Sequence, residues 1–214
     1  MKYGANMTNP SSSISAPNPH VGDLTVDDPR RYFAGAVAVA GKVIAGVSPD
    51  QFDKPTPCTE FDVRQLTGHL VFVLRRVAAV GRGEDPFSVA PVVEGIADDA
   101  WVANWAEAAH DVQTVWSQPG ILDRLMRLPF ATLPGAVAMA IYTAEVTVHT
   151  WDLATATKQV PSWDDEVVAV ALNASERALP AEGRGPELPF GPVVAVPSDA
   201  PLIDRLVAWN GRRP

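Results

Sequence analysis

Apolar side chains recur every three or four residues along most of the chain after residue 28, which is the spacing of helices that bury one face. Asp62, followed three residues later by Gln65, has the capping-box pattern of a helix start. The pattern predicts helices at about residues 29–47, 62–83, 98–118, 135–158, 162–179 and 201–210. Neither an internal repeat nor an alternation of strands with helices is present. We therefore predict an all-α protein, an antiparallel four-helix bundle with an extra C-terminal helix.

The two ends of the chain lack this periodicity. Residues 1–26 are rich in Ser, Asn and Pro, so we predict a disordered N-terminal lead. Residues 27–214 are predicted to form a single domain with a C-terminal extension from about residue 180. Within that extension, residues 193–196 (VVAV) are too few for more than a short extended strap.

Composition narrows the classes of partner. The 214 residues contain 17 Lys and Arg against 25 Asp and Glu, and the net charge of −8 disfavours nucleic acids and anionic membranes as partners. No apolar stretch reaches the roughly 20 residues that a membrane-spanning helix requires, and residues 1–20 lack the apolar region of a secretory signal. The single Cys58 excludes an internal disulfide. We expect a cytoplasmic protein and leave open whether it forms a homodimer.

The predicted helix at 135–158 carries charged residues inside its apolar arc. At about 100° per residue, Tyr142, Glu145, His149 and Asp152 fall on one narrow stripe between aliphatic neighbours. A carboxylate that is buried without a partner costs several kcal/mol. The pattern therefore indicates either a hydrogen-bonded or ionic pair within the bundle or a bound cation, because Glu and His four residues apart can face one ion.

A third ligand would have to come from another helix. Of the four His residues, His20 lies in the predicted lead and His110 on the predicted wet side of its helix, so His69 is the remaining candidate. His69, Glu145 and His149 would form an open site with two imidazoles and one carboxylate, suited to zinc, nickel or iron(II). The alternative is a hydrogen-bonded pair of Glu145 and His149, with His69 as an ordinary core histidine.

Two further residues of the stripe have two interpretations each. Asp152 lies one turn beyond His149 and either orients a ligand imidazole or pairs with an arginine such as Arg75 or Arg76. Tyr142 either lines a substrate pocket or packs in the core with its hydroxyl at a wet edge.

Cys58 has no His near it in the sequence, and we interpret it as a small apolar loop anchor. The Arg pairs at 75–76 and 212–213 are interpreted as solvated charges. An anionic substrate would nevertheless need one such Arg near the metal, and the sequence does not indicate which.

Two segments that contain these residues resemble a known family. Residues 56–70 (TPCTEFDVRQLTGHL) and 145–154 (EVTVHTWDLA) are similar to the two signatures of an actinobacterial family of small metal-binding proteins. These proteins resemble the N-terminal domain of mycothiol-dependent maleylpyruvate isomerase and belong to the DinB-like four-helix-bundle superfamily. Residues 190–214 also resemble the usual ending of the family, so the resemblance runs from about residue 28 to the end.

The resemblance implies a divalent metal, zinc first with nickel or iron(II) as other candidates, held by His69, Glu145 and His149. It further implies that the metal activates a low-molecular-weight thiol or a water, with mycothiol as cosubstrate and a small electrophile as substrate. We therefore predict a metal-dependent thiol S-transferase or a related enzyme. The isomerase carries a separate C-terminal domain, whereas about 35 residues follow the fifth predicted helix, so maleylpyruvate isomerisation itself is not expected.

Two other functions stay open at this point. The first is a non-catalytic helical module that binds a metal or a thiol. The second is a metal-free bundle that acts through a surface groove.

Overall fold

The computed structural model describes residues 28–90, 95–184 and 190–214. In chain order these contain α1 (Pro29–Ala45), the 3-10 turn η1 (Pro49–Gln51), α2 (Val63–Arg82), α3 (Trp101–Trp116), β1 (Leu125–Arg127), β2 (Thr132–Pro134), α4 (Gly135–Thr157), α5 (Asp165–Ala178) and α6 (Leu202–Trp209). The all-α class is confirmed, and the helix ends lie within about three residues of those expected. The predicted disordered lead, residues 1–26, lies outside the described residues.

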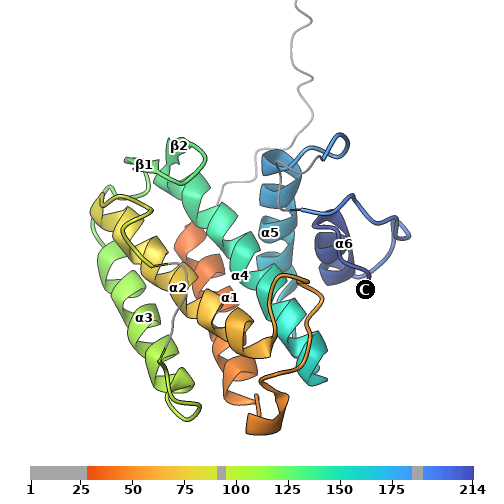
Figure 1. Cartoon of the computed structure of the whole chain (residues 1–214). Coiled ribbons are helices and arrows are strands. Elements are labelled where there is room, and N and C mark those ends of the chain that lie inside the picture. The colour runs from red at the N-terminus through yellow and green to blue at the C-terminus, as the bar shows by residue number, and fades with distance from the viewer. Residues whose placement is uncertain (1–27, 91–94, 185–189) are drawn as a thin grey trace, which may run out of the picture.

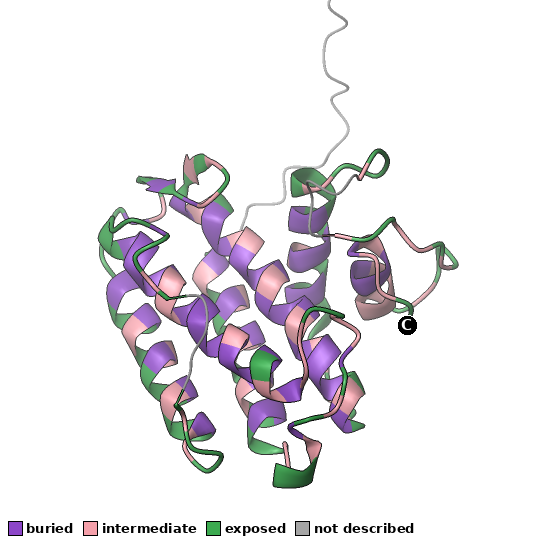
Figure 2. Ribbon diagram, in the orientation of Figure 1, coloured by how far each residue is buried: buried purple, intermediate pink, exposed green. Residues whose placement is uncertain are grey.

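Helices α1 to α4 pack around a common core. α1 packs against α3 and α4, and α2 packs against the same two helices (Figure 1). α5 covers α4 and α1 on another side, and α6 packs against α5. In Figure 2 the buried residues form the inner faces of these helices, as their hydrophobic spacing predicts.

Helix α4 is the central element of this arrangement. It contacts α1, α2, α5 and α6, and it is apolar around most of its circumference because neighbours cover most of its sides. Its buried threonines satisfy their hydroxyls locally; Thr143 and Thr147 each donate to the carbonyl four residues earlier. The carboxylates of α4 cannot donate to backbone carbonyls in this way, so they need donors or cations from other side chains.

The short sheet before α4 was not predicted, since the sequence pattern indicates helices and one extended strap at residues 193–196. β1 and β2 pair antiparallel, with Met126 opposite Leu133, and Met126 is buried beneath the hairpin. Strands of three residues are too short for a period of two to be recognised. At the start of α4, a Cβ on Gly135 would lie 2.4 Å from the carbonyl oxygen of Ile121, so only glycine fits there.

The C-terminal segment folds back on the helices. The predicted strap at 193–196 has no regular strand, and it is attached by the Val194 N–H, which donates to the carbonyl of Ala208. Asn210 and Gly211 end α6 as expected, with Gly211 in the left-handed region at φ 83°. This turn directs the next residue, Arg212, toward α4.

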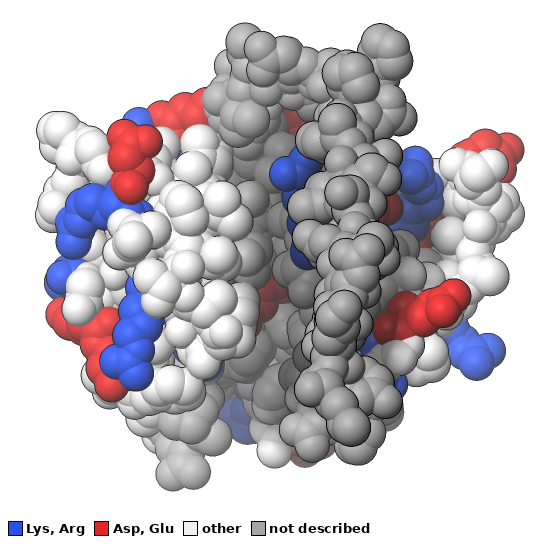
Figure 3. Space-filling model, turned by 90° about the horizontal axis from the view of Figure 1, so that it is seen from above, with Lys and Arg blue, Asp and Glu red and all other residues white. Residues whose placement is uncertain are grey.

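The described surface mixes both signs of charge. Arg82, for example, forms ion pairs with Glu84 and Asp111. On the face in Figure 3, basic and acidic side chains lie interspersed among the atoms that are not grey. No helix within the described ranges combines the length and the apolar character needed to cross a membrane.

The start of α2 offers a direct test of its capping box. The Asp62 side chain accepts from the Gln65 N–H at 2.7 Å, and the Gln65 side chain accepts from the Asp62 N–H at 3.0 Å. We expect Asp62→Ala to lower the free energy of unfolding by about 1 kcal/mol, measured by urea denaturation followed by circular dichroism. Asp62→Ser, which keeps an acceptor, should stay near the wild-type value. Equal losses in both variants would contradict this role of the cap.

Candidate metal centre

The three side chains predicted as metal ligands lie where α2 packs against α4. His69 is on α2, whereas Glu145 and His149 are one turn apart on α4. Nε2 of His69 is 3.7 Å from Oε1 of Glu145, and the His69 and His149 rings meet edge to face with centroids 4.8 Å apart. Their side chains are 16%, 26% and 14% exposed, in chain order, so all three are largely buried but still reach the surface.

Aromatic rings hold His69 in place. Its imidazole stacks on Phe61, with ring centroids 4.9 Å apart, and lies tilted to Phe72 at 5.8 Å. Burial lowers the pKa of His69 to about 3, and the charges of His149 and Arg76 act in the same direction. His69 is therefore neutral near pH 7, which is the form that binds metals.

A fully buried carboxylate lies behind His149. Oδ2 of Asp152 is 3.2 Å from Nδ1 of His149, and Asp152 has no exposed side-chain surface. Burial raises the pKa of Asp152, but hydrogen bonds from His149 and Arg212 outweigh this and hold it below its usual range. Because an ionised carboxylate only accepts, Nδ1–H of His149 donates to it and Nε2 is left for another partner.

The arginine partner of Asp152 is Arg212, and not Arg75 or Arg76 as the ion-pair alternative proposed. Arg212 donates from Nε to Oδ1 at 3.2 Å and from Nη2 to Oδ2 at 2.9 Å. Its side chain is 10% exposed, so the interpretation of Arg212 as a solvated charge is wrong. Sixty residues separate Arg212 from Asp152 in the sequence, so no local sequence pattern could have predicted that they pair.

Cys58 also belongs to this cluster. It lies in the connection between η1 and α2, and its Sγ lies within 4.8 Å of a ring nitrogen of His149 and a carboxylate oxygen of Asp152. Burial by itself lowers the pKa of His149, but the hydrogen bond with Asp152 and the nearby Cys58 outweigh it and raise the pKa to about 9. The interpretation of Cys58 as a small apolar loop anchor did not include these polar neighbours. Its position four residues before the Asp62 cap was the available hint that it lies near the start of α2.

Two sets of side chains could hold a cation here. Among the described residues, Cys58, His149 and Asp152 have ligand atoms that all lie within 4.8 Å of one another, whereas the donor atoms of His69, Glu145 and His149 do not all approach so closely. Yet both oxygens of Asp152 already accept from Arg212, which neutralises the carboxylate.

Glu145 is the carboxylate that lacks a cation. Burial raises its pKa, although the charges of His149 and Arg76 act in the opposite direction. Within the described ranges no Lys or Arg nitrogen lies within 4.0 Å of its carboxylate, and the imidazole 3.7 Å from it, that of His69, is neutral. Two imidazoles and an uncompensated carboxylate are a donor set that suits a divalent ion.

Tyr142 lies one turn before Glu145 on the same side of α4. It is 2% exposed, and its hydroxyl is buried without a hydrogen-bond partner among the described residues. Burial raises its pKa, and the negative charge of Glu145 acts in the same direction. Its hydroxyl thus lies close to the candidate centre and not at a wet edge.

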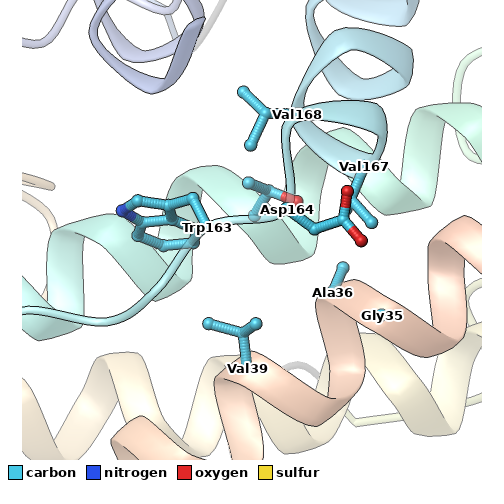
Figure 4. Close-up of a pocket in the computed structure, with 8 residues that line it drawn as sticks. Gly35, Ala36, Val39, Trp163, Asp164, Val167 and Val168 are labelled. Carbon is cyan, nitrogen blue, oxygen red and sulfur yellow. The ribbon is translucent and has the colours of Figure 1, made fainter. Parts of the chain in front are cut away.

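The remaining candidates lie elsewhere. His110 is exposed, as expected, and His20 lies outside the described residues. A small cavity between α1, α4 and α5 is lined by Gly35, Trp163 and Val167 among others (Figure 4). Its volume of about 10 Å³ is near the minimum for one water, so it is too small for a substrate.

Comparison with known proteins connects this geometry to a family. The family described as the mycothiol maleylpyruvate isomerase N-terminal domain matches residues 33–154, a range that includes His69, Glu145 and His149 but not Arg212. Two uncharacterised proteins from two strains of Mycobacterium tuberculosis are each 31% identical over 185 residues, 86% of this chain and 98% of theirs. A crystal structure of a mutant of the mycothiol-dependent maleylpyruvate isomerase has a similar fold, with a TM-score of 0.53 and 10% identity over 69% of this chain and 67% of that chain.

The ion pair of Arg212 with Asp152 gives a test of the buried cluster. We expect Arg212→Met to lower the free energy of unfolding by about 3 kcal/mol, because it removes one partner of a buried carboxylate. Arg213 is exposed and is a matched control, so Arg213→Met should change the value by less than about 0.5 kcal/mol. Urea denaturation measures both variants, and similar small losses would contradict the assigned role of Arg212.

His149 gives a prediction about pH. Its pKa of about 9 in the folded state exceeds the ordinary histidine pKa of 6.5, so the folded state holds a proton that the unfolded state releases between these values. The stability from this group is complete below pH 6.5 and is lost as pH rises through 9. In chelator-treated protein, we therefore expect the free energy of unfolding to fall less steeply over this range in His149→Phe than in wild type. The control His110→Phe should keep the wild-type slope; a wild-type slope in His149→Phe would refute the pairing.

Proposed function

Because the chain belongs to the mycothiol maleylpyruvate isomerase N-terminal domain family, we propose that it is a metal-dependent enzyme that transfers a thiol of the mycothiol type to an electrophile, or a closely related enzyme. The observation that carries the proposal is the position of Glu145. This largely buried carboxylate lies 3.7 Å from a neutral imidazole and has no cationic side chain within ion-pair distance in the described ranges. A bound divalent cation would compensate its charge.

His69, Glu145 and His149 are the residues that would hold the ion. Their nitrogen and carboxylate donors suit zinc first, and nickel or iron(II) as well. A bound ion of this kind supplies the Lewis acidity that removes the proton from a coordinated thiol or water near neutral pH.

The chain itself prepares each donor. His69 is neutral because Phe61 and Phe72 exclude water from its ring, and it offers a free lone pair. Asp152 holds Nδ1–H of His149, which fixes the ring and directs Nε2 away from Asp152. Because the pKa of His149 is about 9, a metal ion that binds Nε2 would displace the proton held there near pH 7. Arg212 donates to both carboxylate oxygens of Asp152 and keeps Asp152 ionised. Asp152 therefore orients His149 and does not itself serve as a metal ligand.

The activity of the isomerase itself is not carried over to this chain. The structural match leaves about a third of the isomerase chain uncovered, and the identity of 10% supports a shared fold only. The single free cysteine is in keeping with the cytoplasm, where low-molecular-weight thiols stay reduced. The partners proposed are therefore a small thiol and a small electrophile.

Metal content tests the proposal. We expect protein purified without added metal to contain about one divalent ion per chain, and His149→Ala to contain less than about a tenth of that, by elemental analysis. His110→Ala should retain the wild-type content. Cys58→Ser separates the two donor sets: it should retain the ion if His69 and Glu145 are ligands and lose it if Cys58 is one. Negligible metal in the wild type would sink the proposal.

Turnover separates an enzyme from a binding module. We expect the wild type, incubated with mycothiol and a panel of electrophiles, to form conjugates, and Glu145→Gln to form them at the uncatalysed rate. A rise in melting temperature with mycothiol but without any product would favour a non-catalytic thiol-binding module instead.

A further inference from the structure

The contact between α2 and α4 continues beyond the candidate metal centre. The two helices run in opposite directions (Figure 1), so residues further along α2 lie level with residues nearer the start of α4. Arg76 lies two turns beyond His69 on α2, and Tyr142 lies one turn before Glu145 on α4. Cζ of Arg76 lies 4.1 Å from the centroid of the Phe72 ring, which also borders His69.

Arg76 and Tyr142 share an unusual feature, which is a buried polar atom without a partner. Nε of Arg76 and the hydroxyl of Tyr142 are both buried and make no hydrogen bond to any described residue. Tyr142 as a whole is 2% exposed. The adjacent Arg75 differs, because its Nη2 donates to Asn104 at 3.0 Å. Buried donors are nearly always satisfied in folded proteins, so two unsatisfied donors beside a candidate active centre are available to a water or a ligand.

The charges around this pair favour an anion. Burial is the main influence on the pKa values of His69, Tyr142 and Glu145, and the positive charge of Arg76 contributes to all three. The stacking of Arg76 on Phe72, which borders His69, places its guanidinium on the same side of α2 as the candidate centre. No carboxylate in the described part of the chain lies within 4.0 Å of Arg76, however, so Glu145 does not serve as its ion-pair partner.

We propose that Arg76 and Tyr142 bind a carboxylate of the electrophilic substrate. The inference rests on the proposed function, because it names the substrate class of the same site: a small electrophile that carries a carboxylate. A guanidinium offers two parallel N–H donors to a carboxylate, and the Tyr142 hydroxyl offers a third donor. Since Arg76 lies two turns from His69, the bound carboxylate would orient the rest of the substrate along the helices toward His69 and Glu145.

The test compares two small probes that differ in whether they carry a negative charge. Propionate and propionamide have nearly the same shape, but only propionate is anionic. We expect propionate to shift the side-chain Nε–H resonance of Arg76 in nitrogen-15 spectra in a saturable manner, and propionamide to bind at least about tenfold more weakly.

Variants locate the binding site. Arg76→Met should weaken propionate binding by at least about tenfold and Tyr142→Phe by about fivefold. Arg75→Met is the matched control, since Arg75 is the neighbouring arginine that already has a partner, and it should bind as the wild type does. The wild-type spectrum needs no variant, so the proposal can be tested even if one of them fails to fold.

Several results would overturn the proposal. These are an Arg76 Nε–H resonance that propionate does not move, equal binding of propionate and propionamide, or equal losses in Arg75→Met and Arg76→Met. A shift caused by mycothiol and abolished in Arg76→Met would assign the pair to the thiol and overturn the assignment to the electrophile. Metal content is measured on the same samples: charge-selective, Arg76-dependent binding in protein without metal would support this proposal while the proposed function failed.

Discussion

Helix α4 is covered by four other helices, and each charge that it carries must be neutralised inside the protein. A polar helix face in water has no such requirement, whereas a carboxylate in this position needs a cation or a proton. Asp152 obtains its cation from Arg212 and from His149. Glu145, two turns earlier, has no side chain that plays this part among the described residues. This difference between two carboxylates on one helix is the reason that a metal is proposed at Glu145 and not at Asp152.

The link between Asp152 and Arg212 also gives the C-terminal segment a function. The family match ends at residue 154, and α6 with its Asn210–Gly211 turn lies beyond it. That turn brings Arg212 to the buried carboxylate. The chain therefore completes the surroundings of His149 with a residue from outside the matched segment. Relatives with a different ending would need another way to keep Asp152 ionised and His149 oriented.

The contact between α2 and α4 combines two kinds of polar group. At one end, the groups around His149 are mutually satisfied, with Asp152, Cys58 and Arg212 forming one connected cluster. At the other end, Arg76 and Tyr142 retain unsatisfied buried atoms. A cluster whose hydrogen bonds are all formed holds its side chains in fixed positions. Buried donors without a partner can still form hydrogen bonds with a ligand, and those bonds would stabilise the complex. The two ends are thus suited to positioning and to recognition, respectively.

The sequence by itself determined the helices and the stripe from Tyr142 to Asp152, because helical periodicity and capping depend only on residues a few positions apart. It also selected His69 as a candidate, since the other histidines could be assigned to the lead or to a wet helix face. The three-residue strands escaped prediction because so short a segment has no readable period.

Only the tertiary structure decided which residues surround that stripe. Cys58 and Arg212 reach His149 and Asp152 from a loop and from the C-terminal turn, and Arg76 stays unpaired although its neighbour Arg75 does not. Such contacts depend on how distant segments return to one place, and an arginine that is buried or solvated looks the same in the sequence. The local sequence pattern determines which side chains lie on each face of a helix. Tertiary packing determines which groups contact each charged side chain.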